Sequence, residues 1–283
     1  MKVRRPTVAG SWYAGTSQSL RAQIEDCFMH EFGPGKLPKV VEEGPRNMLG
    51  LTVPHAGYMY SGSVAASAYY NLAVDGRPDT AVLFGPNHYG LGSGLAIMNE
   101  GVWRTPLGDV EIDAQTANQI LRESRIIDVD DIAHAREHSI ELQLPFLQYL
   151  YGSSFKFVPI SFLMQDLESS REVGRAVAKA LSGRNGLVIA STDMTHYEPQ
   201  ERAEQKDKLA ISAALKMDEE LYYSTVETNG ISTCGYGPVV AAITASKLLS
   251  AKRARLLCYK TSGDITGDFS SVVGYASVSF MKG

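Results

Sequence analysis

The chain alternates short apolar runs with segments whose apolar positions recur every three to four residues. The short runs have strand length and are apolar on both faces, which is typical of strands buried in a sheet, whereas the other segments have helical periodicity and capping residues. Strands and helices that alternate in this way predict an α/β fold with a largely parallel sheet covered on both faces. The expected strands are 48–53, 80–85, 155–160, 187–191, 256–261 and 272–280, and the expected helices are 17–31, 63–72, 113–122, 138–150, 166–181, 202–217, 218–226 and 237–249.

The length of 283 residues allows one large domain or two smaller ones. The Gly- and Pro-rich segment 33–45 resembles a linker, but only about 32 residues precede it, fewer than the roughly 40 that a separate domain needs. The sequence contains no internal repeat, and its amino-acid composition does not divide the chain into two regions. We therefore expect a single domain over residues 1–283.

Charge and cysteine content exclude several classes of protein. The 27 Lys and Arg residues against 31 Asp and Glu give a net charge of -4, and no long basic stretch favours nucleic acid as a partner. Three cysteines cannot form a disulfide framework and fit a reducing compartment. No apolar run approaches the ~20 residues that cross a bilayer, and no signal-peptide pattern is present. We expect a cytoplasmic protein with no nucleic-acid or membrane partner.

Three histidines directly follow expected strands, where ligands bind in open α/β sheets. They are His55, His88 and His196, and Asp193 stands three residues before the last of them. A single such histidine is more often a hydrogen-bonded loop residue. Three together favour a shared site, because imidazole is both a common metal ligand and a general base near neutral pH.

The other three histidines give weaker signals. His138 opens the expected helix 138–150, with Glu141 one turn later. It is either a helix N-terminal residue with a favourable acidic neighbour or part of the site, with Glu141 orienting a histidine. His134 lies in a polar run and is expected in a loop, and His30 is expected at a helix C-terminus.

Cys234 differs from the other two cysteines. Cys27 and Cys258 lie on an apolar helix face and in an apolar strand, where small buried side chains are expected. Cys234 lies in a glycine-rich loop just before the helix 237–249, where a helix N-terminus favours the thiolate. It is either an inert loop thiol or, beside two or three histidines, a ligand of a first-row transition metal that the spacing does not identify.

Common catalytic motifs are missing from the sequence. It contains no GxxxxGK[ST] loop, no strand-borne GxGxxG, no GxSxG elbow and no HExxH. These absences disfavour phosphate-loop, dinucleotide-binding, common hydrolase and zincin functions.

Seven motifs, spread in order over nearly the whole chain, resemble the Memo family. They are RRPTVAGSWYAG, PHAGYMYSG, LFGPNHYG, WRTPLGDVEID, EHSIELQLPFLQY, STDMTHY and STCGYGPV. Memo-like proteins are similar in fold to the class III (LigB-type) extradiol dioxygenases, which are non-haem iron enzymes. The resemblance implies a three-layer α/β/α sandwich with a central mixed, largely parallel sheet.

The resemblance also implies roles for individual residues. His55, His88 and Cys234 look like the metal ligands, and His196 with Asp193 resembles the acid–base position. In the dioxygenases the third ligand is a carboxylate, so a cysteine here departs from the pattern, is softer and is itself oxidisable. Other residues of the motifs are expected to line the pocket or to support the ligands: Trp12, Tyr13, Tyr58, Asn87, His138 and Glu141.

These residues lead us to expect a cleft that holds one transition-metal ion, Fe(II) or Cu, with Zn as a further candidate. The expected function is that of a metal-dependent redox protein. Two alternatives use the same cleft, namely binding of a small molecule or a phosphotyrosine-type peptide without turnover, and copper handling. Animal Memo-like proteins are associated with phosphotyrosine-containing receptor tails, but no Arg clamp for a phosphate is evident near the motifs.

Overall fold

A twelve-stranded sheet forms the centre of the protein in a computed structural model that describes residues 2–283. Apart from Lys156 at an outer end, every residue of its four middle strands is buried, as expected for strands covered on both faces. These strands run parallel, in the spatial order β8 (Lys156–Phe162), β3 (Thr80–Pro86), β9 (Gly186–Ser191) and β2 (Met48–Val53).

Antiparallel strands lie on both sides of this parallel centre, so the sheet is mixed. The outer strands are β1 (Val3–Arg4), β4 (Leu95–Ile97), β5 (Val102–Thr105), β6 (Gly108–Ile112), β7 (Asp128–Val129), β10 (His196–Glu198), β11 (Ala251–Thr261) and β12 (Val272–Lys282). β12 runs antiparallel to β2 and also pairs with β10 and β11. On the other side, β6 runs parallel to β8 and is followed by β5 and β1.

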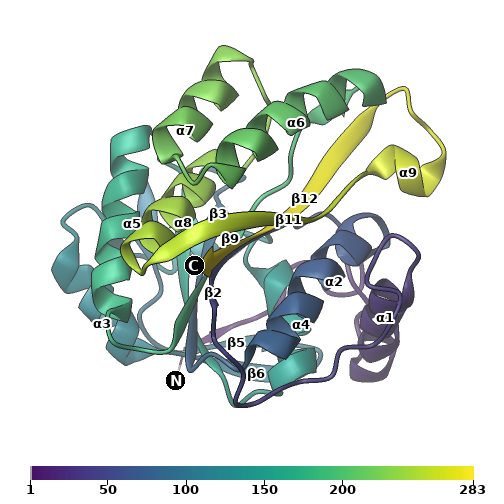
Figure 1. Cartoon of the computed structure of the whole chain (residues 1–283). Helices are drawn as coiled ribbons and strands as arrows, with labels where there is room; N and C mark the ends of the chain where they lie inside the picture. Colours follow the sequence, from purple (N-terminus) through teal and green to yellow (C-terminus); the bar gives the residue numbers. More distant parts are fainter. Residues whose placement is uncertain (1) are drawn as a thin grey trace.

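Helices cover both faces of the sheet, which gives three layers (Figure 1). One face carries α3 (Ala114–Glu123), α5 (Leu167–Leu181), α6 (Gln200–Leu215), α7 (Glu219–Thr228) and α8 (Tyr236–Leu248), and the other carries α1 (Ser17–Met29), α2 (Tyr58–Asp75) and α4 (Leu144–Tyr151). Each set packs its buried side chains into its own hydrophobic cluster against the sheet. Over residues 2–283, none of the helices has the length and hydropathy needed to cross a membrane.

The six expected strands and eight expected helices are present with shifted ends. β11 begins at Ala251 rather than at 256, and α2 begins at Tyr58 rather than at 63. The expected helix 138–150 is divided, because a turn and a 3₁₀ helix (Glu141–Gln143) precede α4. The sequence did not reveal β1, β4, β5, β6, β7, β10 or α9 (Ser262–Thr266), since two to five residues are too few to show a period.

Candidate metal centre

The ends of three neighbouring parallel strands bring three of the expected residues together. β3, β9 and β2 are adjacent in the sheet, and His88, Asp193 and His55 each follow the carboxyl end of one of them. Parallel strands end at the same edge of a sheet, so these residues meet although they are far apart in sequence. Asp193 Oδ1 accepts a hydrogen bond from the backbone N–H of His55 at 2.7 Å.

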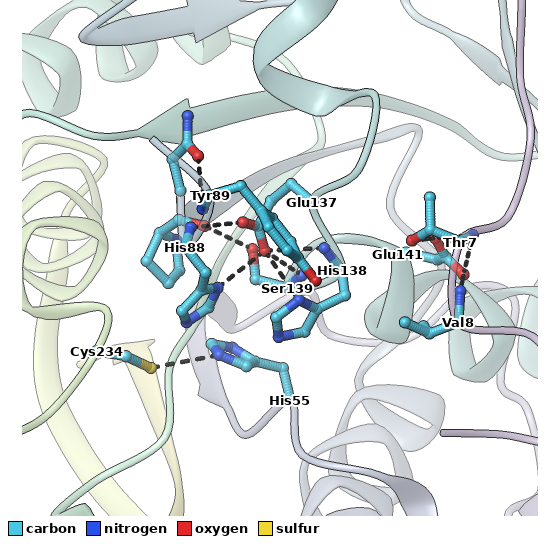
Figure 2. A network of polar contacts seen from close by, with 12 residues as sticks. Thr7, Val8, His55, His88, Tyr89, Glu137, His138, Ser139, Glu141 and Cys234 are labelled. Atoms are coloured by element: carbon cyan, nitrogen blue, oxygen red, sulfur yellow. Dashed lines mark hydrogen bonds and ion pairs between the residues drawn. The ribbon is translucent and has the colours of Figure 1, made fainter. Parts of the chain in front are cut away.

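His55, His88 and His138 form a group, here called the histidine cluster, that could hold a metal ion. One ring nitrogen of each lies within 4.8 Å of those of the other two. Ring centroids are 5.2 Å apart for His55 and His88, and 4.6 Å apart for His88 and His138. Figure 2 shows the three rings converging. His55 and His138 are buried, whereas His88 is exposed, so the cluster is accessible from one side.

The carboxylate of Glu137 holds two members of the histidine cluster, although it was not among the residues expected at the site. Its Oε1 accepts from Nδ1 of His88 at 3.0 Å and from the backbone N–H of His138 at 2.8 Å, and its Oε2 accepts from the backbone N–H of His88 at 2.6 Å. Burial alone would raise the pKa of Glu137, but the hydrogen bond from His88 and the charges of both histidines lower it to about 2. A carboxylate on one nitrogen of a histidine orients the other nitrogen toward a metal.

Ser191, the last residue of β9, orients His55. Its Oγ lies 2.9 Å from Nδ1 of His55, donates to the carbonyl of Ser139 and accepts from the Gln143 amide. Nδ1 of His55 therefore carries the proton, and Nε2 is left for a ligand. Burial lowers the pKa of His55 well below its usual value and that of His138 to about 4, so both are neutral at neutral pH, the form that binds metals.

A glycine in β3 allows the segment of His138 to approach the sheet. A Cβ at Gly85 would overlap Ser139 Oγ and lie 2.8 Å from Cγ1 of Ile140. Ser139 Oγ donates to the carbonyl of Pro86 at 3.0 Å. The turn that replaces the expected start of the helix thus packs against β3 and places His138 in the histidine cluster.

Cys234 lies beside the histidine cluster. Its Sγ is 3.3 Å from Nε2 of His55 and accepts from the backbone N–H of Asp193 at 3.2 Å. The expected preference for the thiolate is not found, because burial, and then the charge of Asp193, raise the pKa of the Cys234 thiol. The ligand set of His55, His88 and Cys234 stays a prediction, since the group of mutually close donor atoms has His138 in the third place.

His196 and Asp193, the expected acid–base pair, face the same pocket. Nδ1 of His196 donates to the carbonyl of Ser232 at 2.8 Å, and the His196 backbone N–H donates to Ser232 Oγ at 2.8 Å. The ring is therefore fixed with Nε2 as an acceptor for a ligand proton. Burial raises the pKa of Asp193 to about 6, so this carboxyl changes its protonation near neutral pH.

The N-terminal segment forms one wall of the pocket, and Glu141 holds it in place. The ring of Trp12 lies 4.3 Å from that of His138, centroid to centroid. The buried carboxylate of Glu141 accepts from the hydroxyl of Tyr13 at 2.7 Å and from the backbone N–H of Thr7 at 2.9 Å. Figure 2 shows Glu141 facing Thr7, apart from the histidine cluster. Glu141 thus orients the N-terminal segment rather than a histidine.

Two other residues expected near the site have structural contacts. Tyr58, the first residue of α2, is buried and donates to the carbonyl of Leu142 at 2.7 Å. The Asn87 side chain accepts from the backbone N–H of Gly90 at 3.0 Å and donates to the carbonyl of Leu91 at 2.7 Å. Neither belongs to the pocket lining found for residues 2–283, so they support the loops that carry the site.

A pocket of about 1000 Å³ adjoins the histidine cluster. Within the described part of the chain, its lining contains no Lys or Arg. Its polar site residues and aromatic walls include Trp12, Tyr13, His55, Tyr60, His88, Tyr89, His138, Asp193, His196, Tyr197 and Tyr275.

The two remaining histidines lie outside the site. His134, which was expected in a loop, is buried in a short 3₁₀ helix (Ile132–His134), and its Nε2 donates to the carbonyl of Ala96 at 3.1 Å. His30 caps the C-terminus of α1, as expected, and its Nδ1 accepts from the backbone N–H of Phe32 at 3.1 Å.

The fold and the site define an α/β protein with a histidine cluster suited to a metal ion, beside a pocket at the carboxyl edge of a parallel sheet. Residues 4–279 match the family described as Memo-like protein. The chain therefore belongs to the Memo family, in agreement with the resemblance of its motifs.

Two relatives support this placement, and a solved structure shares the fold. A MEMO1 family protein of Methanopyrus kandleri is 50% identical over 282 residues, which cover 99% of each chain. Another, of Methanothermobacter thermautotrophicus, is 51% identical over 279 residues, covering 98% of this chain and 100% of the relative. The crystal structure of an uncharacterized protein from Escherichia coli K12 has a TM-score of 0.57 and covers 82% of this chain and 99% of its own. Its sequence identity is 15%, so this likeness shows the fold alone.

Proposed function

We propose that this protein is a metal-dependent redox protein that binds one iron or copper ion at the histidine cluster. The observation that supports it is the convergence of three histidine nitrogens within 4.8 Å of one another. Glu137 and Ser191 hold the opposite nitrogens of His88 and His55, which is typical of metal-binding histidines. Imidazole donors suit iron, copper or zinc rather than the oxygen-preferring Mg²⁺ and Ca²⁺.

The residues around the cluster would exchange protons with a bound ligand and shield it from water during redox chemistry. Iron or copper would supply one-electron transfer and open coordination positions beside the pocket. His196, fixed by Ser232, would accept a ligand proton at Nε2. Asp193 would take up or release a proton near neutral pH, and Trp12 would exclude water from the side of His138.

Metal content and oxygen consumption test the proposal. Protein purified without oxygen and supplied with Fe(II) or Cu(I) should bind about one ion per chain and consume oxygen when a reductant is present. His55→Ala and His88→Ala should lose both properties, because each removes a nitrogen donor. His30→Ala is the matched control, since His30 lies outside the site, and it should retain both. Metal binding that survives in both cluster variants would contradict the proposal.

Copper handling is a second candidate function, and the position of Cys234 favours it. Its sulfur, 3.3 Å from Nε2 of His55, adds a soft donor to the imidazoles, and soft donors select Cu(I). Cys234→Ser should then weaken Cu(I) binding more than Fe(II) binding. Tight Cu(I) binding without oxygen consumption in the presence of any reductant would favour handling over catalysis.

Binding of a peptide that carries phosphotyrosine is a further hypothesis for this pocket. Its aromatic walls suit a peptide, but no Lys or Arg among residues 2–283 lines it, and phosphate recognition commonly relies on Arg. Titration with matched phosphorylated and plain peptides tests the hypothesis. Equal affinity for the two peptides would exclude phosphate recognition.

A further inference from the structure

Tyr197 combines a strained backbone with an exposed aromatic ring in the wall of the pocket. Its φ of 58° lies in the left-handed region, which non-glycine residues other than Asn and Asp seldom adopt. The residue is 77% exposed, so packing in the protein core does not account for this conformation. Strained residues of this kind persist where the surrounding structure enforces them, and they cluster at ligand-binding sites.

The contacts on both sides of Tyr197 enforce this conformation. The backbone N–H of His196 donates to Ser232 Oγ at 2.8 Å. On the other side, the carboxylate of Glu198 pairs with Arg202 at 2.8 Å and with Lys206 at 2.6 Å. The pairing of β10 with β12 shifts register between His196 and Glu198, so the chain bulges at Tyr197 and turns its ring outward.

A negatively charged loop contributes to the same pocket. Asp268 and Tyr275 both line the pocket. Hydrogen bonds from the side chain and the backbone of Ser270 lower the pKa of Asp268. The carboxylate is therefore ionised at neutral pH. The loop lies close to the segment of Tyr197, because the backbone N–H of Gln200 donates to the carbonyl of Phe269 at 3.0 Å.

The charges around the pocket disfavour an anion on this side. No Lys or Arg of residues 2–283 lines the pocket. Arg136 lies 5.2 Å from the centroid of the Tyr89 ring, and Tyr89 in turn lies beside His138. That cation therefore belongs to the side of the histidine cluster, while the side of Asp268 has a carboxylate and exposed aromatic carbon.

We propose that the pocket binds an organic cation, an ammonium group joined to an aromatic or alkyl part, and that the ring of Tyr197 and the carboxylate of Asp268 hold this group. Ammonium groups are attracted to the face of an aromatic ring and to a carboxylate, and a fixed backbone at Tyr197 leaves only the side-chain torsions to be ordered on binding. This inference depends on the proposed function in one respect: the part of the ligand away from the ammonium group is placed at the histidine cluster.

Three probes that share a phenylethyl group test the charge preference: 2-phenylethylamine, 2-phenylethanol and 3-phenylpropionate. Their affinities are measured by calorimetry at neutral pH, with the full chain freed of metal by a chelator and again loaded with redox-inert Zn²⁺. The cation should bind the metal-free protein about tenfold more tightly than the anion, with the alcohol between them. Anion binding equal to cation binding, or no binding of any probe at roughly 10 mM, would overturn the proposal.

Variants of the two residues test their roles separately. Asp268→Asn should reduce the preference for cation over anion about threefold or more, and Tyr197→Ala should weaken the cation by about as much, whereas Tyr197→Phe should not. An unchanged preference in Asp268→Asn would overturn the role of the carboxylate.

Tyr197→Gly separates binding from folding. Glycine adopts the left-handed conformation without strain, so the unfolding midpoint of this variant should not fall while cation affinity does. A lower midpoint together with lower affinity would make Tyr197 a structural residue and would overturn its proposed role. Metal content, measured in the same samples, tests the proposed function independently, because neither residue belongs to the histidine cluster.

Discussion

Glu137 serves two members of the histidine cluster through one carboxylate, so its replacement should weaken metal binding without removing a ligand. In Glu137→Gln one of the two acceptor oxygens is replaced by an NH₂ group, which donates. The one remaining oxygen cannot accept from both Nδ1 and the backbone N–H of His88. We expect metal affinity to fall about 10- to 100-fold, measured by competition with a chelator. Glu111→Gln, which loses an exposed ion pair with Lys156, is the control and should keep its affinity. Equal affinity of the two variants would contradict the role of Glu137.

His134 should make the stability of the fold depend on pH, although it lies outside the site. Burial lowers its pKa from 6.5 to about 4, so the unfolded chain binds more protons between these values. The contribution of neutral His134 is therefore fully present above about pH 6.5 and is lost as the pH falls toward about 4. The lowered pKa corresponds to a contribution on the order of 3 kcal/mol.

His134→Gln tests this contribution, because glutamine keeps a donor for the carbonyl of Ala96 and does not titrate in this range. Urea unfolding of metal-free protein gives the free energy of unfolding at about pH 7.5 and about pH 5. The loss between the two should be about 2 kcal/mol smaller in His134→Gln than in the original chain. An equal loss would show that His134 does not contribute.

Position relative to the strands decided which site residues could be predicted. His55, His88 and His196 follow strands, and the topology of a parallel sheet brings such positions together. His138 was ambiguous, because its place depends on a turn that packs against Gly85, and that contact leaves no local pattern. Glu137 stands next to a histidine, which was the available signal, but carboxylates that orient histidines have no fixed spacing.

At the level of elements, the contact of β3 with the turn before α4 sets the position of His138. Gly85→Ala should force this turn away, because the added Cβ would lie 2.8 Å from Ile140 Cγ1. We expect a loss of about 1 to 3 kcal/mol in the free energy of unfolding, measured in urea, together with weaker metal binding.

Gly174→Ala is the matched control for this prediction. A Cβ at Gly174 in α5 would lie 2.6 Å from the carbonyl oxygen of Ala241 and 2.7 Å from Cβ of Thr244, both in α8. This variant should lose stability by a similar amount, since it also overpacks, but should bind metal as before. Metal affinity that falls equally in both variants would mean that instability, rather than the displaced turn, causes the effect.

Element length explains how far the sequence predicted the fold. The middle strands have six or seven residues with both faces covered, so their apolar runs were distinct. β10 has three residues and pairs with β12 through a shifted register, and no periodicity marks it. The short outer strands depend on tertiary contacts with the finished sheet, which a local pattern does not record.

The whole chain should unfold as one unit, as the expectation of a single domain over residues 1–283 requires. Each middle strand contributes to both hydrophobic clusters, as Val188 and Ile189 of β9 do on opposite faces. Neither face can lose its helices without exposing strands that the other face needs. Urea unfolding followed by tryptophan fluorescence, to which the buried Trp103 and the exposed Trp12 contribute, and by far-UV circular dichroism should therefore give coincident transitions. Two separate transitions would contradict a single domain.

The spatial order of the central strands has a consequence for the newly synthesised chain. β9 lies between β3 and β2, so the strands that end near His88 and His55 become neighbours of a common strand only after residue 191 has been made. His138 leaves the ribosome before β9 does. Ser191, which orients His55, is the last residue of β9 and leaves only with that strand. A nascent chain that stops before β9 can place His138 beside His88, but it lacks the strand and the Ser191 side chain that position His55, so the histidine cluster is incomplete. A metal ion bound by the complete cluster would therefore be captured after the sheet has assembled.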